Sequence, residues 1–80
     1  MGIHKLVVKR ILELCDSQNI TVNALAYKSG VSQSTIKSIL NGESQNPGIV
    51  TIKKLCDGLG IDIVEFFDTK KFRNLEQEIK

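Results

Sequence analysis

Apolar side chains recur at helical spacing along most of the chain, and the alternation of apolar and polar positions that is typical of strands is nearly absent. The first stripe predicts an amphipathic helix over about residues 4–17. Its apolar positions are Val7, Val8, Ile11, Leu12, Leu14 and Cys15. The polar run 17–19 ends the pattern.

Two short helices are predicted next, over about 22–29 and 33–41. Thr21 and Ser32 precede them as N-caps, because a hydroxyl oxygen accepts a hydrogen bond from a free amide of the first turn. Gly30 ends the first of the two as a left-handed C-terminal residue. The side chains expected to face the core are Leu25, Ala26, Ile36, Ile39 and Leu40.

Residues 43–48 form a loop by composition and contain the only proline of the chain. A fourth helix is predicted over about 49–58, and its apolar side consists of Ile49, Ile52, Leu55, Cys56 and Leu59. Asp62 opens a short fifth helix, and Glu65 three residues later completes a capping box. This helix presents Ile63, Phe66 and Phe67. The pattern predicts a compact all-α domain of five helices.

The C-terminal segment carries Phe72, Leu75 and Ile79 at positions i, i+3 and i+7. This spacing is compatible with a sixth helix that docks on the core or on a second subunit, and equally with a frayed, solvated end. We therefore expect a domain over 1–68, with the helix-turn-helix at about 21–41, and a tail over 69–80 that serves in dimerisation or docking.

The composition is that of one soluble globular domain, with 80 residues, 41% hydrophobic and 25% charged. No run approaches the roughly 20 apolar residues of a membrane span, and no segment resembles a secretory signal. We expect a cytoplasmic protein with no membrane partner. Residues 1–40 hold five basic and two acidic groups, and residues 41–80 hold six basic and seven acidic groups. The cationic excess of the first half suits an anionic partner, although an ordinary solvated surface has the same charge.

The chain has too few cysteine and histidine residues for a zinc site or a nucleophile–base pair. Cys15 and Cys56 stand 41 positions apart and His4 is the single histidine, which excludes a self-contained structural zinc site. We expect two buried free thiols and a solvated His4 in a frayed N-terminus. No nucleophile–base pair is available, so the chain is not expected to be an enzyme or to hold a cofactor or metal.

The helix predicted over 33–41 has an unusual outward face, which consists of Gln33, Ser34, Lys37, Ser38 and Asn41. An ordinary solvated helix would carry Glu and Lys here, for helix propensity and ion pairs. Four of these five residues are instead neutral hydrogen-bonding groups. Gln pairs bidentately with adenine in the major groove, and Ser both donates and accepts at base edges. Two short helices joined at a glycine turn also have helix-turn-helix geometry. The face favours DNA reading, and a plain polar surface is the alternative.

Several short motifs are specific in combination. They are Leu25-Ala26, Gly30-Val31-Ser32, Ile36, Asn41-Gly42, Asn46-Pro47, Thr51-Ile52, Leu55, Leu59-Gly60-Ile61 and Phe66-Phe67. With them, the stretch 21–42 resembles the helix-turn-helix of the phage-repressor-like (Cro/repressor, XRE) family, and the resemblance covers about residues 8–68. It implies a five-helix domain whose third helix lies in the major groove of double-stranded DNA.

Carried over by position, the resemblance places Gln33, Ser34 and Ser38 at base edges, with Lys37 beside them. A helix N-terminus offers unpaired amides to phosphate, so the start of the second helix is a candidate anion site. The candidate phosphate contacts are Thr21, Asn23, Lys28, Thr35, Asn41, Ser44 and Gln45. Two of these residues have structural alternatives. Asn41 precedes a glycine, which is typical of a helix C-terminus, and the alternative for Thr35 is packing within the domain.

The chain departs from the family pattern at three points. Val22 stands where the family often has a phosphate-binding Gln, and Ala24 replaces a frequent Glu, which weakens the cap by about 0.5–1 kcal/mol. The outward face also lacks arginine, the usual guanine reader. We therefore expect modest affinity as a monomer and a need for dimerisation. Three or four neutralised phosphates would give a slope of log K against log salt of about −3 to −4.

The first functional hypothesis is a sequence-specific transcriptional regulator that acts as a dimeric repressor on an inverted repeat with half-sites about one helical turn apart. The candidate dimer surface consists of Phe66, Phe67, Phe72, Leu75 and Ile79, and core packing is the alternative for the aromatic residues. Any signal would arrive through a protein partner, proteolysis or concentration. The second hypothesis is a protein-interaction module on the same fold, such as an antitoxin or anti-repressor.

Overall fold

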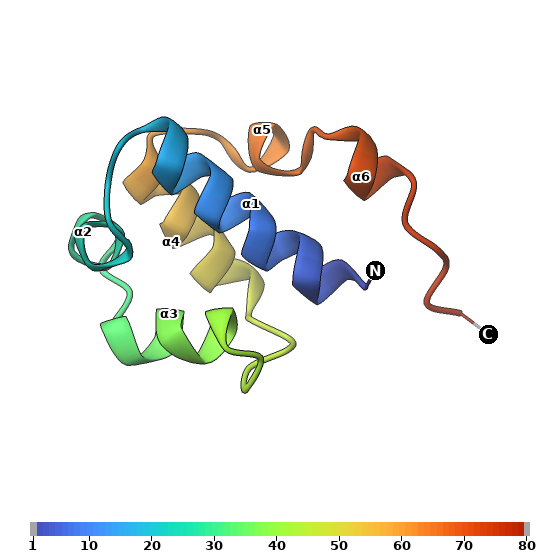
Figure 1. Cartoon of the computed structure of the whole chain (residues 1–80), viewed down its shortest axis with the longest axis horizontal. Helices are drawn as coiled ribbons and strands as arrows, with labels where there is room; N and C mark the ends of the chain where they lie inside the picture. Colours follow the sequence, from blue (N-terminus) through green and yellow to red (C-terminus); the bar gives the residue numbers. More distant parts are fainter. Residues whose placement is uncertain (1, 80) are drawn as a thin grey trace.

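The computed structural model describes residues 2–79, which form six helices and no strand. They are α1 (Ile3–Ser17), α2 (Val22–Ser29), α3 (Gln33–Leu40), α4 (Ile49–Leu59), α5 (Ile63–Phe67) and α6 (Lys70–Arg73), shown in Figure 1. The all-α prediction is therefore confirmed. Met1, the first residue of the predicted domain, and Lys80, the last residue of the predicted tail, lie outside the described residues.

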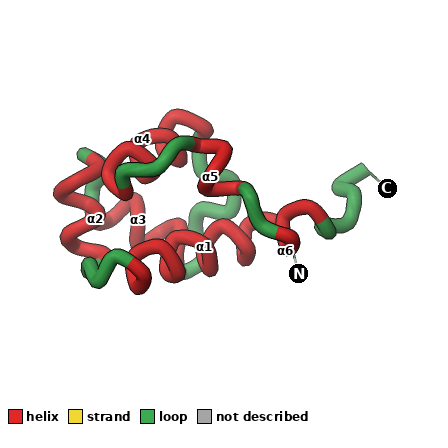
Figure 2. The backbone as a smooth tube through the Cα atoms, turned by 90° about the horizontal axis from the view of Figure 1, so that it is seen from above, coloured by secondary structure: helices red, strands yellow, loops and turns green. Residues whose placement is uncertain are grey.

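Helices α1 and α4 lie on opposite sides of the domain, and α2 closes one end between them (Figure 2). The core fills the space that these helices enclose. Its most deeply buried side chains are Ile11, Leu25, Ile36, Ile39, Leu55, Cys56 and Phe66. Every helix from α1 to α5 contributes at least one of them, so the packing of α3 depends on the whole domain.

The helix bounds differ from the predicted ones by a single residue at three points. Helix α1 begins at Ile3, α3 ends at Leu40, and α4 continues through Gly58 to Leu59. The fourth helix runs on because its left-handed terminator is Gly60, at φ 71°, and not Gly58. The C-cap Asn41 likewise follows α3 without belonging to it.

The aromatic residues of the C-terminal part pack against one another. Phe66 is fully buried, so its assignment to a dimer surface was wrong and the core alternative holds for it. The ring of Phe67 meets the rings of Phe66 and Phe72 edge-on, at centroid distances of 4.8 and 5.0 Å. Phe72 is partly buried against the core and docks the single turn of α6. Beyond Arg73 the chain leaves the body of the domain, and Ile79 is 85% exposed (Figure 1).

Two apolar residues that were predicted to face inward do not. Leu12 is 46% exposed, because one helical position turns it about 100° away from the fully buried Ile11. Ile49 is 68% exposed, because it is the first residue of α4 and lies one turn before the buried Ile52. The apolar face of α4 therefore extends past the core into solvent.

Cys15 and Cys56 are buried free thiols, as predicted. Burial raises the pKa of both thiols above the ordinary value. Among residues 2–79 no three His, Cys, Asp or Glu side chains are grouped closely enough to hold a metal ion. No helix in this part of the chain is both long and apolar enough to cross a bilayer.

Candidate nucleic-acid interface

Helices α2 and α3 are each capped by the residue that the sequence indicates. The Ala24 amide donates to Thr21 Oγ1 at 3.0 Å, and the Thr35 amide donates to Ser32 Oγ at 3.2 Å. Gly30 ends α2 in the left-handed conformation, at φ 71°. These local bonds fix where the two helices begin and end, and they leave the other first-turn amides of α2 free to meet an anion.

A close contact between Gly58 and Ser29 sets the position of α2 on α4. A Cβ atom on Gly58 would lie 2.8 Å from Ser29 Cβ and 2.9 Å from the Ser29 amide nitrogen. Only a glycine permits this approach of the two backbones. The Ser29 hydroxyl also donates to the Ala26 carbonyl and accepts from the Val31 amide, both at 3.3 Å. The turn that leads into α3 is therefore held against α4.

Helix α3 is fixed from its inner side. Ile36 and Ile39 are buried to 0% and 1% exposure. His4 Nε2 donates to the Ile39 carbonyl at 2.8 Å, from the first turn of α1 to the last turn of α3. The expectation of a solvated His4 was therefore wrong. A local sequence pattern does not show that an N-terminal helix will pass beside a carbonyl 35 positions away.

Helix α3 lies along one edge of the molecule (Figure 1). Gln33, Ser34 and Lys37 are exposed, whereas Ser38 is partly buried and therefore less accessible than its helical position suggests. Within residues 2–79 the side chains of Gln33 and Lys37 make no hydrogen bond. They are available to an external partner without loss of an internal contact.

The serine and threonine hydroxyls at the start of α3 form a small cluster. The Ser32 hydroxyl donates to Thr35 Oγ1 at 2.8 Å, and its oxygen lies 3.2 Å from Ser34 Oγ. Ser34 and Thr35 are both exposed. Each retains hydrogen-bonding capacity, since a hydroxyl is one donor and two acceptors.

The candidate phosphate contacts fall into two groups. Thr21, Asn23 and Lys28 are exposed on or beside α2, and Thr35 is exposed on α3. The others lie on the loop after α3, where internal bonds occupy part of their capacity. The Ser44 amide donates to the Ser38 carbonyl at 2.9 Å, and Gln45 Nε2 donates to the Gly42 carbonyl at 3.2 Å. The backbone amide of Ser44 is therefore not free for a phosphate.

Asn41 and Glu43 form a pair that the sequence interpretation missed. Asn41 Nδ2 donates to Glu43 Oε1 at 3.0 Å, and the Glu43 amide donates to Asn41 Oδ1 at 3.0 Å. The structural alternative for Asn41, a role at the helix C-terminus, therefore has direct support. The pair also places a carboxylate among the candidate phosphate contacts, where it would repel DNA. The only sequence signal was the acidic residue that directly follows Asn41-Gly42.

Residues 9–66 match the helix-turn-helix family. Two curated proteins of Bacillus subtilis (strain 168) are similar to the chain. The uncharacterized HTH-type transcriptional regulator RghRB is 45% identical over 48 residues, which are 60% of this chain and 34% of that protein. The HTH-type transcriptional regulator SlrR is 32% identical over 65 residues, which are 80% of this chain and 43% of that protein. The matched region thus spans less than half the length of either relative.

Two solved structures have the same fold. The crystal structure of the prophage Lp1 protein 11 has a TM-score of 0.82 and 36% identity, and the match covers 94% of this chain and all of that one. The wild-type restriction-modification controller protein C.Esp1396I has a TM-score of 0.69 and 28% identity over 76% of this chain and 78% of its own. The chain therefore belongs to the XRE-type helix-turn-helix family, a family of DNA-binding transcriptional regulators and not of enzymes.

Proposed function

We propose that this chain is a dimeric transcriptional repressor that recognises an inverted repeat in double-stranded DNA through α3. The observation that carries the proposal is the outward face of α3. Within the described residues the exposed side chain of Gln33 makes no hydrogen bond and Ser34 Oγ contacts only Ser32 Oγ, while Ile36, Ile39 and His4 hold the inner side of the helix. A rigid helix with free hydrogen-bonding groups is what direct readout in the major groove requires.

Gln33 is the proposed principal base reader. It is the first residue of α3, it is exposed, and its amide group has a donor and an acceptor free for the N6 and N7 atoms of adenine. Ser34 and Lys37 extend the reading surface along the exposed face. Ser38 contributes less in this proposal because it is partly buried, and a bridging water would carry its contact.

The proposed phosphate contacts flank that face. The amides at the start of α2, together with Thr21 and Asn23, bind one phosphate, since no acidic residue stands in the first turn of α2. Lys28 and Thr35 supply further contacts, and the loop residues Asn41, Ser44 and Gln45 contribute through their side chains. These contacts set the register of α3 on the duplex.

Repression follows in this proposal from occupancy of DNA that the polymerase needs, and it takes place in the cytoplasm. Residues 1–68 are the proposed DNA-binding domain, and residues 69–80 are the proposed tail. Signals would reach the repressor through its concentration or through a protein partner. The description of C.Esp1396I as a controller protein is consistent with a regulatory role for a domain of this shape.

Selection from a randomised duplex pool at about physiological salt tests the proposal. The wild-type chain is compared with Gln33→Ala and with the matched control Gln77→Ala, since Gln77 is exposed in the tail. We expect wild type and Gln77→Ala to enrich the same inverted repeat. Gln33→Ala should lose preference at one position of each half-site, at a cost of about 1–3 kcal/mol. Failure of the wild type to enrich any sequence would refute the proposal.

A further inference from the structure

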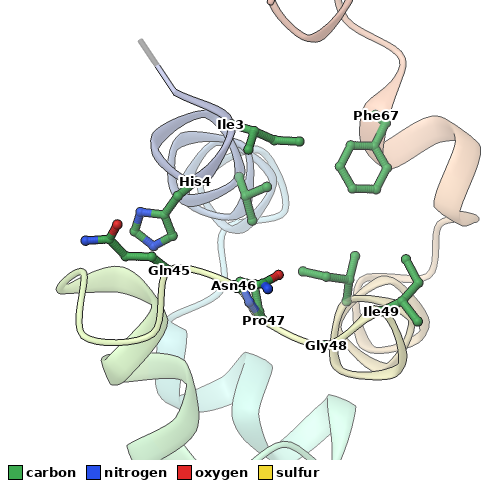
Figure 3. Close-up of a pocket in the computed structure, with 10 residues that line it drawn as sticks. Ile3, His4, Gln45, Asn46, Pro47, Gly48, Ile49 and Phe67 are labelled. Atoms are coloured by element: carbon green, nitrogen blue, oxygen red, sulfur yellow. The ribbon is translucent and has the colours of Figure 1, made fainter. Parts of the chain in front are cut away.

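Two surface cavities border helix α1, and they differ in charge. The larger, of about 420 Å³, lies between Ile3 and His4 of α1, loop residues 45–48 and Phe67 of α5 (Figure 3). None of the described residues that line it is a lysine, arginine, aspartate or glutamate. The smaller, of about 250 Å³, lies between α1 and α6, and we call it the α1–α6 cavity. Charged side chains surround this second cavity, so it can select a partner by charge.

The charge at the α1–α6 cavity is strongly positive. Its cationic residues are Lys9, Arg10, Lys70 and Lys71, and Glu13 is the one acidic residue among the described residues that line it. Together these five residues carry a net charge of +3, whereas the whole chain carries +2. The positive charge of the protein is therefore concentrated at this one place.

The chain does not neutralise this cluster itself. Within residues 2–79 the ammonium groups of Lys9, Lys70 and Lys71 make no ion pair or hydrogen bond, and all three side chains are exposed. The Arg10 guanidinium is fixed by its bonds to two main-chain carbonyls of α5, which carry no formal charge. Like charges gathered in this way repel one another and oppose folding. An anionic partner would relieve that repulsion.

We propose that the α1–α6 cavity is a docking site for an acidic segment of a partner protein, which inserts one large apolar side chain beside Leu6 and Phe72. Leu6 is buried and Phe72 is partly buried, so they supply the apolar part of the cavity wall. The carboxylates of the segment pair with Lys9, Lys70 and Lys71 around this anchor. An apolar centre with a polar rim is typical of protein interfaces. The proposal is independent of the DNA sequence that α3 reads.

The size and composition of the cavity favour a peptide over other anions. Sites for small molecules have volumes of about 300–1,000 Å³, so a cavity of about 250 Å³ is small for a nucleotide but admits a single side chain. A DNA duplex presents a continuous row of phosphates, and the Glu13 carboxylate would repel it. A peptide can instead place its carboxylates beside the lysines and leave Glu13 unopposed.

The position of the cavity allows a partner to bind while α3 is on DNA. Figure 1 shows α6 at the upper right of the molecule and α3 at the bottom, and the two helices are also apart in Figure 2. None of the described residues that line the cavity is a candidate base or phosphate contact. The site therefore provides a surface through which a protein signal reaches the chain without competition from DNA.

Fluorescence anisotropy with a labelled acidic peptide tests the site on the full chain, without DNA and at low salt. The probe carries one central phenylalanine between glutamates. Two comparison peptides replace the phenylalanine by alanine or the glutamates by glutamine. We expect the probe to bind most tightly, the alanine peptide about threefold or more weakly, and the glutamine peptide not at all, because the site needs both the charges and the anchor.

The double variant Lys70→Gln/Lys71→Gln should raise the dissociation constant of the probe about tenfold or more. The matched control is Lys53→Gln/Lys54→Gln, which removes the same charge from an adjacent pair of exposed lysines on α4. It should change the dissociation constant by less than about twofold, because screening weakens charges far from the site. Thermal denaturation should show Lys70→Gln/Lys71→Gln to be as stable as wild type, since neither ammonium group has a partner within the described chain.

Failure of the wild type to bind the probe would overturn the proposal. Equal losses in the two double variants would do the same, because they would assign the binding to net charge alone. Equal affinity for the probe and the alanine peptide would exclude the apolar anchor and, with it, the proposed mode of docking. A duplex without an operator that binds wild type but not Lys70→Gln/Lys71→Gln would assign the cavity to DNA and overturn the choice of a protein partner.

Discussion

The Arg10 guanidinium of α1 donates to the Phe66 main-chain carbonyl, with 2.7 Å between Arg10 Nε and the carbonyl oxygen. Arg10 Nη2 donates to the neighbouring Glu65 carbonyl at 2.8 Å. Both carbonyls belong to the five-residue helix α5, which is too short to satisfy its own C-terminal acceptors. Arg10 therefore ties α5, and with it the buried ring of Phe66, to the first helix.

Replacement of Arg10 by Met keeps an apolar stem and removes both donated bonds. We expect Arg10→Met to lower the free energy of unfolding by about 1.5–3 kcal/mol, because hydrogen bonds from a charged donor are lost and two carbonyls are left without this partner. Urea denaturation followed by circular dichroism measures the loss. Arg10→Lys should recover only part of it, since an ammonium cannot reproduce the planar fork of donors. Equal stability of Arg10→Met and wild type would contradict this role.

The backbone contact between Gly58 and Ser29 gives a second prediction. A methyl group on Gly58 meets the Ser29 backbone at 2.9 Å, so α2 must shift away from α4 to admit it. We expect Gly58→Ala to cost about 1–3 kcal/mol of stability by overpacking, although alanine is the better helix former. Gly2→Ala is the control, because no atom lies within 4 Å of the Cβ that it adds. A rise in the melting temperature of Gly58→Ala would show that the two helices separate without cost.

The carboxylate of Glu43 is predicted to weaken DNA binding. Glu43→Gln removes one negative charge among the candidate phosphate contacts and keeps an oxygen that can accept from Asn41 Nδ2. We expect DNA to bind about two- to fivefold more tightly at low salt, with the gain shrinking as salt screens the charge. Anisotropy titrations at several salt concentrations measure it, and Glu78→Gln in the exposed tail is the matched control. Equal gains in both variants would assign the effect to net charge alone.

The two buried thiols predict a dependence of stability on pH. Burial raises the pKa of Cys15 and Cys56 above the ordinary value of a thiol, so the folded chain holds their protons at a pH where the unfolded chain releases them. The free energy of unfolding should therefore be unaffected by these groups below about pH 9 and should fall as the pH rises further, by at most about 1.4 kcal/mol per pH unit for each thiol.

Denaturation at a series of pH values checks this slope, and Cys15→Ala with Cys56→Ala should reduce it. A thiol reagent at pH 8 should react slowly with the folded protein and fast in denaturant, because the thiolate is the reactive form. Fast reaction of the folded protein would show that the thiols are accessible and ionised.

The parts of the fold that local chemistry controls were predictable from the sequence. Thr21, Ser32 and Gly30 mark the ends of α2 and α3 by bonds and dihedral angles that involve only their near neighbours. The buried positions of α3 followed from helical spacing for the same reason, since Ile36 and Ile39 need only the period of one helix to be placed.

The errors arose where distant segments meet. His4 bonds a carbonyl 35 positions away, and Phe66 enters the core because the chain folds α5 back onto α1. Ile49 shows the opposite case, since its helical face continues where no other helix covers it. Helical periodicity predicts which side of a helix is apolar. It does not predict how much of that side is covered by other helices. The exposure of Ile49 could therefore not be predicted from the sequence pattern.

Base-pair substitution in the selected operator tests the reading of DNA by α3 most directly. Each base pair of one half-site is exchanged in turn, and the dissociation constants of wild type and Gln33→Ala are measured on every duplex at one salt concentration. We predict that exchange of the base pair that Gln33 contacts costs wild type about 1–3 kcal/mol of binding free energy. The same exchange should leave the affinity of Gln33→Ala unchanged, whereas exchanges at the other positions should affect both proteins equally. Equal discrimination by both proteins at every position would contradict recognition through Gln33.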